Sequence, residues 1–325
     1  MGSPSRERGD AVRRLVAANL PGYRVDSVVP VGEGTDHLAY EVNGELIVRQ
    51  VKEPDPAPRA APVDRAGQVD RAAQVDREMR LLAAVAAISP LPVPEPSFAV
   101  PEQGWLAYRR LPGEPLLDQP RRRWWSAHAG SIAATLGELF AALHAAPTEP
   151  LAALAGVDDQ PLAGWRREAA EAYVAVAGEV PVARRPRVEA FLEAPPPAEG
   201  WTPVFSHNDL GIEHVLVDPD TWTVTGIIDW SDAAVVDPAV DFGRLYRDLG
   251  PAVDLGRLYR DLGPAAAHAA VGSGRAGADE LASLAERAVF YARCGVLEDL
   301  AYGLQTGRAR YVDKSLAAMA WLFPA

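Results

Sequence analysis

Residues 23–51, YRVDSVVPVGEGTDHLAYEVNGELIVRQV, constrain the fold most, because they alternate apolar and polar residues and are rich in valine. That pattern is typical of half-buried strands. Asn43-Gly44 lies between two of the strand-like segments. Both residues tolerate a positive φ, so the dipeptide predicts a two-residue hairpin turn. The chain is therefore expected to open as an antiparallel meander, with the loop Gly32-Glu33-Gly34 between its first two strands.

The next segment, 53–78, begins rich in proline and continues with the unit VDRxxQ at six-residue spacing. Six residues do not return a helix to the same face, so the repeat predicts an expanded linker. It leads into a predicted helix, REMRLLAAVAAI, at 77–88. Strand-like segments at 90–100 and 104–111 then complete a five-stranded sheet with one helix inserted after its third strand.

Beyond Pro115 the pattern is mostly helical. One predicted helix, 131–147, places Ile132, Leu136, Leu139, Phe140 and Leu143 on one face. Short strands are expected at PVFSH, HVLVD and VTGIIDW, and helices after them. The predicted class is α+β, with an N-terminal unit over 1–111 and a mainly helical unit over 112–325. The segment 240–252 recurs almost unchanged at 253–265, which we interpret as a tandem duplication lengthening one loop or helix.

Composition excludes several classes of protein. The 325 residues are 48% hydrophobic, which indicates a globular chain. The formal net charge of −12 argues against a nucleic-acid partner and is compatible with a cationic small molecule. Cys294 is the single cysteine, so no intrachain disulfide can form. Neither a membrane-spanning apolar run nor a signal peptide is recognisable, so we expect a cytoplasmic protein without a membrane partner.

The segment FSHNDLGIEHVLVD, 205–218, carries the strongest chemical signal. It holds His207, Asp209 and His214, and an apolar strand and Asp229 follow. Phosphoryl transfer needs a carboxylate to meet the acceptor hydroxyl, and further ligands to hold Mg²⁺ against nucleotide phosphates. Asp209 fits the first role, and His214 and Asp229 fit the second.

Three segments, SHNDLGIEHVLVD, VTGIIDWSDAAVVDPAVDF and LGELFAALHAAP, resemble the aminoglycoside and macrolide phosphotransferases. The resemblance extends from VPVGEGTDHLAYEV to Asp241. It implies a bilobal protein-kinase-like fold, with Asp209 as catalytic base, Asp229 as principal metal ligand, and MgATP or MgGTP as phosphate donor. His207 is expected to brace the catalytic loop.

His214 departs from the protein-kinase pattern, which has asparagine five residues after the catalytic aspartate. Some antibiotic kinases of the resembled group also carry histidine there. A neutral imidazole can ligate a metal, although Mg²⁺ prefers oxygen. The alternative, in which His214 only forms hydrogen bonds within the loop, stays open.

The resembled family holds nucleotide phosphates with a basic strand residue that pairs with a helical glutamate. Arg49 and Glu78 match those positions. Lys52 competes with Arg49, but three positions along a strand it points to the opposite face. Taken singly, Arg49 is also explained as an ordinary exposed strand residue, and Glu78 as part of a solvated helix face. Together and in this order, the two residues favour the functional interpretation.

Further nucleotide contacts are implied in the same region. Gly32 and Gly34 would lie over the phosphates, although a plain β-turn explains them equally well. Tyr108 takes the position that discriminates adenine from guanine in related enzymes, or packs in the core. Arg110 and Leu111 belong to the presumed hinge. The choice between ATP and GTP therefore stays open.

Other charged residues are expected to have structural roles. Asp237-Pro238 is expected to cap a helix, and Asp241 and His144 to be structural. The residues that could line an acidic cleft, but are expected to be solvated surface charges, are Asp232, Glu298 and Asp299.

The predicted function is transfer of the γ-phosphate of ATP or GTP to a hydroxyl of an aminoglycoside, macrolide or similar antibiotic, by a monomer. The alternative is a metabolite kinase acting on choline, homoserine or a sugar. A non-catalytic module is disfavoured because Asp209 and Asp229 are both present. A protein kinase is disfavoured by IDW in place of D-F-G.

Overall fold

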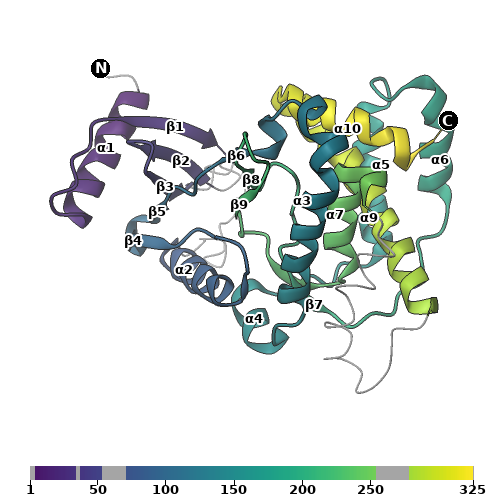
Figure 1. Cartoon of the computed structure of the whole chain (residues 1–325), viewed down its shortest axis with the longest axis horizontal. Coiled ribbons are helices and arrows are strands. Elements are labelled where there is room, and N and C mark those ends of the chain that lie inside the picture. Colours follow the sequence, from purple (N-terminus) through teal and green to yellow (C-terminus); the bar gives the residue numbers. More distant parts are fainter. Residues whose placement is uncertain (1–3, 34–36, 53–70, 254–277, 325) are drawn as a thin grey trace, which may run out of the picture. The chain divides into compact units, whose positions relative to one another are not determined.

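The computed structural model describes residues 4–33, 37–52, 71–253 and 278–324 (Figure 1). The chain divides into two compact units. The first unit is Met1–Ala87 with Val93–Leu111, and the second is Ile88–Pro92 with Pro112–Ala325.

The first unit contains the predicted five-stranded antiparallel sheet, which is thereby confirmed. Its strand order is β1-β2-β3-β5-β4. The elements in chain order are α1 (Pro4–Asn19), β1 (Val28–Glu33), β2 (His37–Val42), β3 (Leu46–Val51), α2 (Arg71–Ile88), β4 (Pro96–Val100) and β5 (Trp105–Arg109). The predicted hairpin turn is also confirmed, since Asn43 has φ 56° and Gly44 φ 73°. The Asn43 side chain accepts the backbone N–H groups of Asp26 and Ser27, which ties the turn to the preceding segment.

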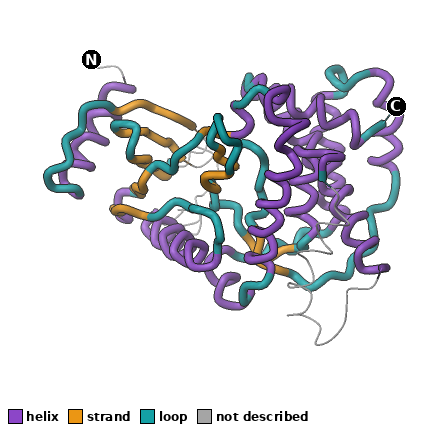
Figure 2. The backbone as a smooth tube through the Cα atoms, in the orientation of Figure 1, coloured by secondary structure: helices purple, strands orange, loops and turns teal. Residues whose placement is uncertain are grey.

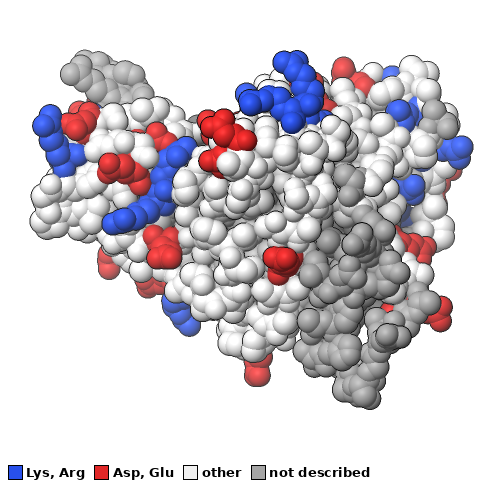
Figure 3. All heavy atoms as spheres, in the orientation of Figure 1, with Lys and Arg blue, Asp and Glu red and all other residues white. Residues whose placement is uncertain are grey.

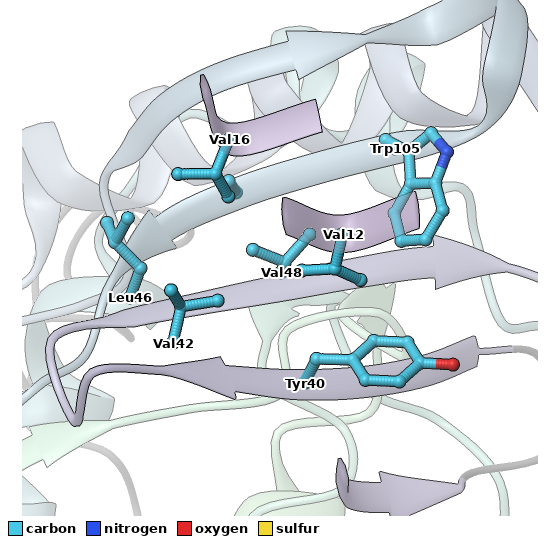
Figure 4. Packing of buried hydrophobic residues seen from close by; sticks show 8 residues of the cluster. Val12, Val16, Tyr40, Val42, Leu46, Val48 and Trp105 are labelled. Atoms are coloured by element: carbon cyan, nitrogen blue, oxygen red, sulfur yellow. The ribbon is translucent and has the colours of Figure 1, made fainter. Parts of the chain in front are cut away.

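The two helices of this unit cover opposite faces of the sheet. Val12 and Val16 of α1 lie in one apolar cluster with Val48 of β3 and Trp105 of β5 (Figure 4). Successive side chains of a strand point to opposite faces, so Arg49 points away from this cluster and reaches α2. The sheet therefore has an apolar face against α1 and a face carrying charged residues toward α2.

The second unit is mainly helical, as the sequence predicts (Figure 2). Its helices are α3 (Arg121–His144), α4 (Thr148–Ala155), α5 (Leu162–Val176), α6 (Arg185–Glu193), α7 (Ala239–Leu249), α9 (Ala278–Thr306) and α10 (Ala309–Leu322). Its strands are β6 (Glu114–Pro115), β7 (Val204–Ser206), β8 (Val215–Val217), β9 (Val224–Ile227) and β10 (Ala234–Val236). β7 pairs with β10, and β8 lies between β6 and β9. Short 3₁₀ turns occupy Pro101–Gln103, Leu116–Asp118, Val182–Arg184 and Gly250–Ala252.

The apolar face predicted for 131–147 is confirmed. Each of its five residues is at most 2% exposed, and α3 packs with this face inward. His144 at the end of α3 is buried, and its Nε2 lies 2.8 Å from Asp241 Oδ2 at the start of α7. Asp237 accepts the N–H of Ala239, as a capping residue does, and also pairs with Arg287. These three residues therefore hold elements together.

The described residues include only part of the two repetitive segments, the duplication at 240–265 and the linker that begins at residue 53. The first copy, 240–252, forms most of α7 and the following 3₁₀ turn. The second copy from 254 onward, and the linker 53–70, lie outside the described residues. The helix predicted from residue 77 begins earlier, at Arg71.

Figure 3 shows Lys and Arg side chains interspersed with Asp and Glu side chains on the face in view. Among the described helices, none taken singly is long and apolar enough to cross a membrane. The bent pair α3–α4 meets those two criteria jointly.

Candidate active site

The loop after β7 begins with a buried histidine and a sharp turn. His207 is fully buried, and its Nε2 lies 3.0 Å from the Ile228 carbonyl. It therefore donates a hydrogen bond to the residue that follows β9. Asn208 has φ 67°, a left-handed conformation that asparagine tolerates better than most residues. Its N–H bonds Ser206 Oγ, and its side chain reaches Asp158. This turn presents Asp209, whose side chain is 35% exposed.

His214 lies between two carboxylates. Its Nδ1 donates to the Asp209 carbonyl at 2.8 Å, and its Nε2 lies 3.7 Å from Asp229 Oδ2. The Nδ1 contact leaves the Nε2 lone pair directed toward Asp229 in the neutral ring. Nδ1 also lies 3.9 Å from Asp209 Oδ2. The order in space is therefore Asp209, His214, Asp229.

Asp229 is held by a second left-handed residue and by pairing of its segment with the loop. Its own φ is 63°, and its Oδ1 accepts the Ser231 hydroxyl. The preceding residue, Ile228, donates its N–H to the His214 carbonyl. Together with the His207–Ile228 bond, this contact fixes the two segments side by side. Positive φ at non-glycine residues is costly, and its occurrence twice here is typical of functional sites.

The charges of the site shift its pKa values in opposite directions. Burial raises the pKa of Asp209, but Arg244 and His214 outweigh it, so the net direction is downward. Burial lowers the pKa of His214, but Glu213, Asp209 and Asp229 outweigh it, and the net direction is upward. Burial, helped by His214, lowers the pKa of His207. Asp209 is therefore an anion and His207 a neutral donor.

Below the loop lies a buried charge cluster made of Glu213, Arg247, Asp248, Asp299 and Lys314. Lys314 Nζ lies 2.6 and 2.8 Å from the two Glu213 oxygens and 2.9 Å from Asp299. Arg247 binds Asp248 through two nitrogens, at 2.8 and 2.9 Å. Asp248 in turn accepts the Ile212 N–H at 3.0 Å. The cluster thus anchors the loop between Asp209 and His214 to α7, α9 and α10.

The expectation of solvated surface charges is wrong for Asp299 and Glu298. Asp299 is 15% exposed and belongs to the buried charge cluster. Glu298 Oε1 is buried without a hydrogen-bond partner among the described residues, and burial raises the pKa of this carboxyl. Both residues lie on α9, and the packing of α7 and α5 against α9 buries them. Asp232 is exposed, as expected.

In the first unit, the predicted pair of Arg49 and Glu78 is confirmed. Arg49 Nη1 lies 2.8 Å from Glu78 Oε1, and the two side chains are 12% and 11% exposed. His37 adds a contact, with Nδ1 3.0 Å from Arg49 Nη2. Neither residue is thus an ordinary exposed charge.

The other predicted nucleotide residues are spread over the same unit. Gly32 is exposed at a register shift of β1, and Gly34 lies outside the described residues. Tyr108 is half-buried on β5, opposite Ile47. Arg110 pairs with Glu41 at 2.9 Å. The last of the predicted nucleotide residues, Leu111, is half-buried at the end of the unit.

Sequence reasoning missed Arg244, Arg247 and Lys314. The first two stand in the repeated segment, which was noted only as a duplication. Lys314 lies in an ordinary helical pattern, and the residues next to it in the sequence do not indicate which carboxylates it contacts. Only the packing of α7 and α10 onto the loop brings these residues to the site.

The chain belongs to the phosphotransferase enzyme family (APH), whose sequence model matches residues 27–282. Among solved structures, it is similar to the GDP complex of wild-type aminoglycoside 2′-phosphotransferase-IIIa, with 20% identity and a TM-score of 0.64, covering 96% of this chain and 97% of that one. It is also similar to the macrolide 2′-phosphotransferase MphH of Brachybacterium faecium, with 25% identity and a TM-score of 0.56, covering 97% of this chain and 99% of that one. These likenesses show a kinase-like antibiotic-phosphotransferase fold.

A curated relative, the uncharacterized protein YcbJ of Bacillus subtilis (strain 168), is 29% identical over 163 residues. The match covers 46% of this chain and 50% of that protein. The chain thus spans about half the length of the curated relative it matches.

Proposed function

We propose that this phosphotransferase moves the γ-phosphate of ATP or GTP to a hydroxyl of an antibiotic, such as an aminoglycoside or a macrolide. The observation that carries the proposal is the order Asp209, His214, Asp229, with His214 3.9 Å from one carboxylate and 3.7 Å from the other. A proton acceptor next to two potential metal ligands is what phosphoryl transfer requires.

Asp229 and His214 would hold Mg²⁺. Among the described residues, no three or more His, Cys, Asp or Glu side chains form a set that could hold a metal ion alone. That fits Mg²⁺, which is typically bound by one or two protein ligands together with water and nucleotide phosphates. The neutral form of His214 would offer Nε2 as a ligand, 3.7 Å from Asp229 Oδ2, so the two side chains could hold one ion. When bound, the ion would neutralise charge on the phosphates.

Asp209 would receive the acceptor hydroxyl. Its lowered pKa keeps it ionised at neutral pH, so it can orient the hydroxyl and take its proton. A loose transition state asks for little basicity, so a lowered pKa is no obstacle. His207 would act indirectly, by fixing the end of β9 beside the loop.

Arg49 would bind nucleotide phosphates, with Glu78 holding the guanidinium in place at 2.8 Å. Gly32, Gly34, Tyr108, Arg110 and Leu111 are the further proposed nucleotide contacts. Similar solved structures include a GDP complex and a streptomycin–ATP complex, so both purines occur among them. The donor is therefore proposed as ATP or GTP.

The test is a nucleotide-turnover screen of the purified protein. MgATP and MgGTP are offered separately with a panel of aminoglycosides and macrolides, and with choline, homoserine and simple sugars. The proposal expects acceptor-dependent nucleotide consumption with at least one antibiotic, and a phosphorylated product by mass spectrometry. Turnover with choline, homoserine or a sugar, and with no antibiotic, would establish the metabolite-kinase alternative instead.

A further inference from the structure

His37 is the first residue of β2, and its side chain is buried beside Arg49 and Glu78. Its Nδ1 lies 3.0 Å from Arg49 Nη2, and its Nε2 lies 3.8 Å from Glu78 Oε2. The other terminal nitrogen of Arg49, Nη1, lies 2.8 Å from Glu78 Oε1. The Arg49 guanidinium therefore contacts two different elements of the first unit, β2 through His37 and α2 through Glu78.

The register of the sheet brings His37 and Arg49 together. His37 pairs with Val51 and Ala39 pairs with Arg49, so His37 and Arg49 are diagonal neighbours on the same face of β2 and β3. Diagonal neighbours in an antiparallel pair lie about 7–8 Å apart, within reach of long side chains. The residue directly opposite Arg49 is Ala39, whose single methyl group is too short to block the diagonal. The contact thus follows from the pairing of the two strands.

The contact also determines which nitrogen of His37 carries the proton. A guanidinium has donors and no acceptor, so His37 Nδ1 accepts the hydrogen bond and carries no proton. The ring is then neutral, and its hydrogen is on Nε2, the nitrogen that faces the Glu78 carboxylate. Arg49 thus donates to both partners, while the Nε2–H group of His37 faces the carboxylate that also binds Arg49.

We propose that His37 is a positioning residue, which accepts a hydrogen bond at Nδ1 and so fixes the plane in which the Arg49 guanidinium binds nucleotide phosphates. Glu78 holds Nη1 and His37 holds Nη2, so both terminal nitrogens of the planar fork are held. A guanidinium fixed in this way loses less side-chain freedom when phosphate binds. The inference rests on the proposed function, because it assumes that Arg49 binds the nucleotide.

The test measures nucleotide affinity of the full chain by titration calorimetry, with MgATP and MgGTP offered separately. His37→Leu removes the acceptor, whereas His37→Asn retains one, because the asparagine Oδ1 and the histidine Nδ1 are both bonded to Cγ. His128→Leu, on α3 of the second unit, makes the same substitution away from Arg49. His37→Leu is also made in the Arg49→Ala chain, which completes a double-mutant cycle. The thermal unfolding transition of each variant shows whether it folds.

We expect His37→Leu to weaken nucleotide binding about fivefold, the effect of one hydrogen bond of about 1 kcal/mol. His37→Asn should stay within about twofold of the wild type, and His128→Leu should change nothing. In the Arg49→Ala chain, His37→Leu should cause no further loss, because the guanidinium that it positions is gone. The protonation of the ring is measured on the wild-type chain by NMR of ¹⁵N-labelled histidine. The chain has six histidines, and the resonances lost in His37→Asn identify this ring, with Nε2 protonated and Nδ1 not.

Any of four results would overturn the proposal while leaving the proposed function in place: unchanged nucleotide affinity in His37→Leu, equal losses in His37→Leu and His37→Asn, an undiminished effect of His37→Leu in the Arg49→Ala chain, or a proton on Nδ1. The last result is read from the wild-type chain, so it decides even if His37→Leu does not fold. A wild-type chain that binds neither MgATP nor MgGTP would instead contradict the proposed phosphotransfer, and the positioning role of His37 with it.

Discussion

Asp229 and His214 differ in what they offer a hard cation. Asp229 brings a negative charge and oxygen ligands, whereas His214 brings a neutral nitrogen. We therefore predict that Asp229→Ala weakens Mg²⁺-dependent nucleotide binding about a hundredfold, and that His214→Ala weakens it about tenfold. Titration calorimetry with and without Mg²⁺ measures both. Asp232→Ala, an exposed carboxylate three positions on, is the charge-matched control. A larger loss in His214→Ala would reverse the ranking of the two ligands.

Arg49 is predicted to act on the nucleotide and not on the acceptor. Its guanidinium, held 2.8 Å from Glu78, is preorganised for phosphate. Arg49→Ala should raise the nucleotide KM about tenfold to a hundredfold while the acceptor KM stays near its wild-type value. Arg109→Ala, an exposed arginine of the same sheet, serves as the control in steady-state kinetics. An unchanged nucleotide KM in Arg49→Ala would assign the role to Lys52.

At the scale of elements, the buried charge cluster connects α10 to the loop between Asp209 and His214. Lys314→Met removes the nearest cation of the buried Glu213 carboxylate and leaves Arg247, 3.9 Å from Glu213 and 3.0 Å from Asp299, as the cation of both. We therefore predict a loss of about 3 kcal/mol in the free energy of unfolding. Arg310→Met removes a cation from the same helix. Its ion pair with Asp118 is 56% and 49% exposed, so it should cost less than about 1 kcal/mol. Urea unfolding of both variants measures the difference, and equal losses would contradict the anchoring role.

The same cluster predicts a pH dependence. Burial raises the pKa of Asp248, but Arg247 and Lys314 outweigh it, so the pKa in the folded chain is lower than normal. The unfolded chain therefore takes up this proton first as the pH falls. The stability that Asp248 contributes is present above about pH 4 and is lost below it. Urea unfolding should show that the difference in the free energy of unfolding between the wild type and Asp248→Asn is constant near neutral pH. This difference should decrease below about pH 4.

The sequence predicts an element when the residues that determine it lie close together along the chain. Asn43-Gly44 determines its own turn, so the turn was predictable. Arg49 and Glu78 are 29 positions apart, and their pairing was predicted through the resemblance to the antibiotic kinases. Asp209, His214 and Asp229 were found through a motif whose spacing is itself local. Lys314 meets Glu213 across 101 positions of sequence, and Arg244 meets Asp209 through helix packing. No periodicity along the chain encodes these contacts, which is why the buried charge cluster and Arg244 were missed.

At the scale of the whole molecule, the duplicated segment offers a test of what the fold requires. The first copy already supplies Asp241, Arg247 and Asp248, each with partners in the second unit. We predict that deleting 253–265 leaves a soluble chain with a cooperative thermal transition close to the wild-type one, followed by circular dichroism. Aggregation of this variant, or a non-cooperative transition, would mean that the second copy is part of the core.

The central claim is that Asp209 receives the acceptor hydroxyl. Asp209→Asn retains the shape of the side chain and removes the charge, while Asp229 and His214 keep their places. Single-turnover kinetics, with whichever acceptor the screen identifies, separates chemistry from binding. The account predicts a rate of transfer lower by about 10²–10⁴-fold and an unchanged nucleotide affinity. Near-normal transfer by Asp209→Asn would contradict the account, because the proton acceptor would then lie elsewhere.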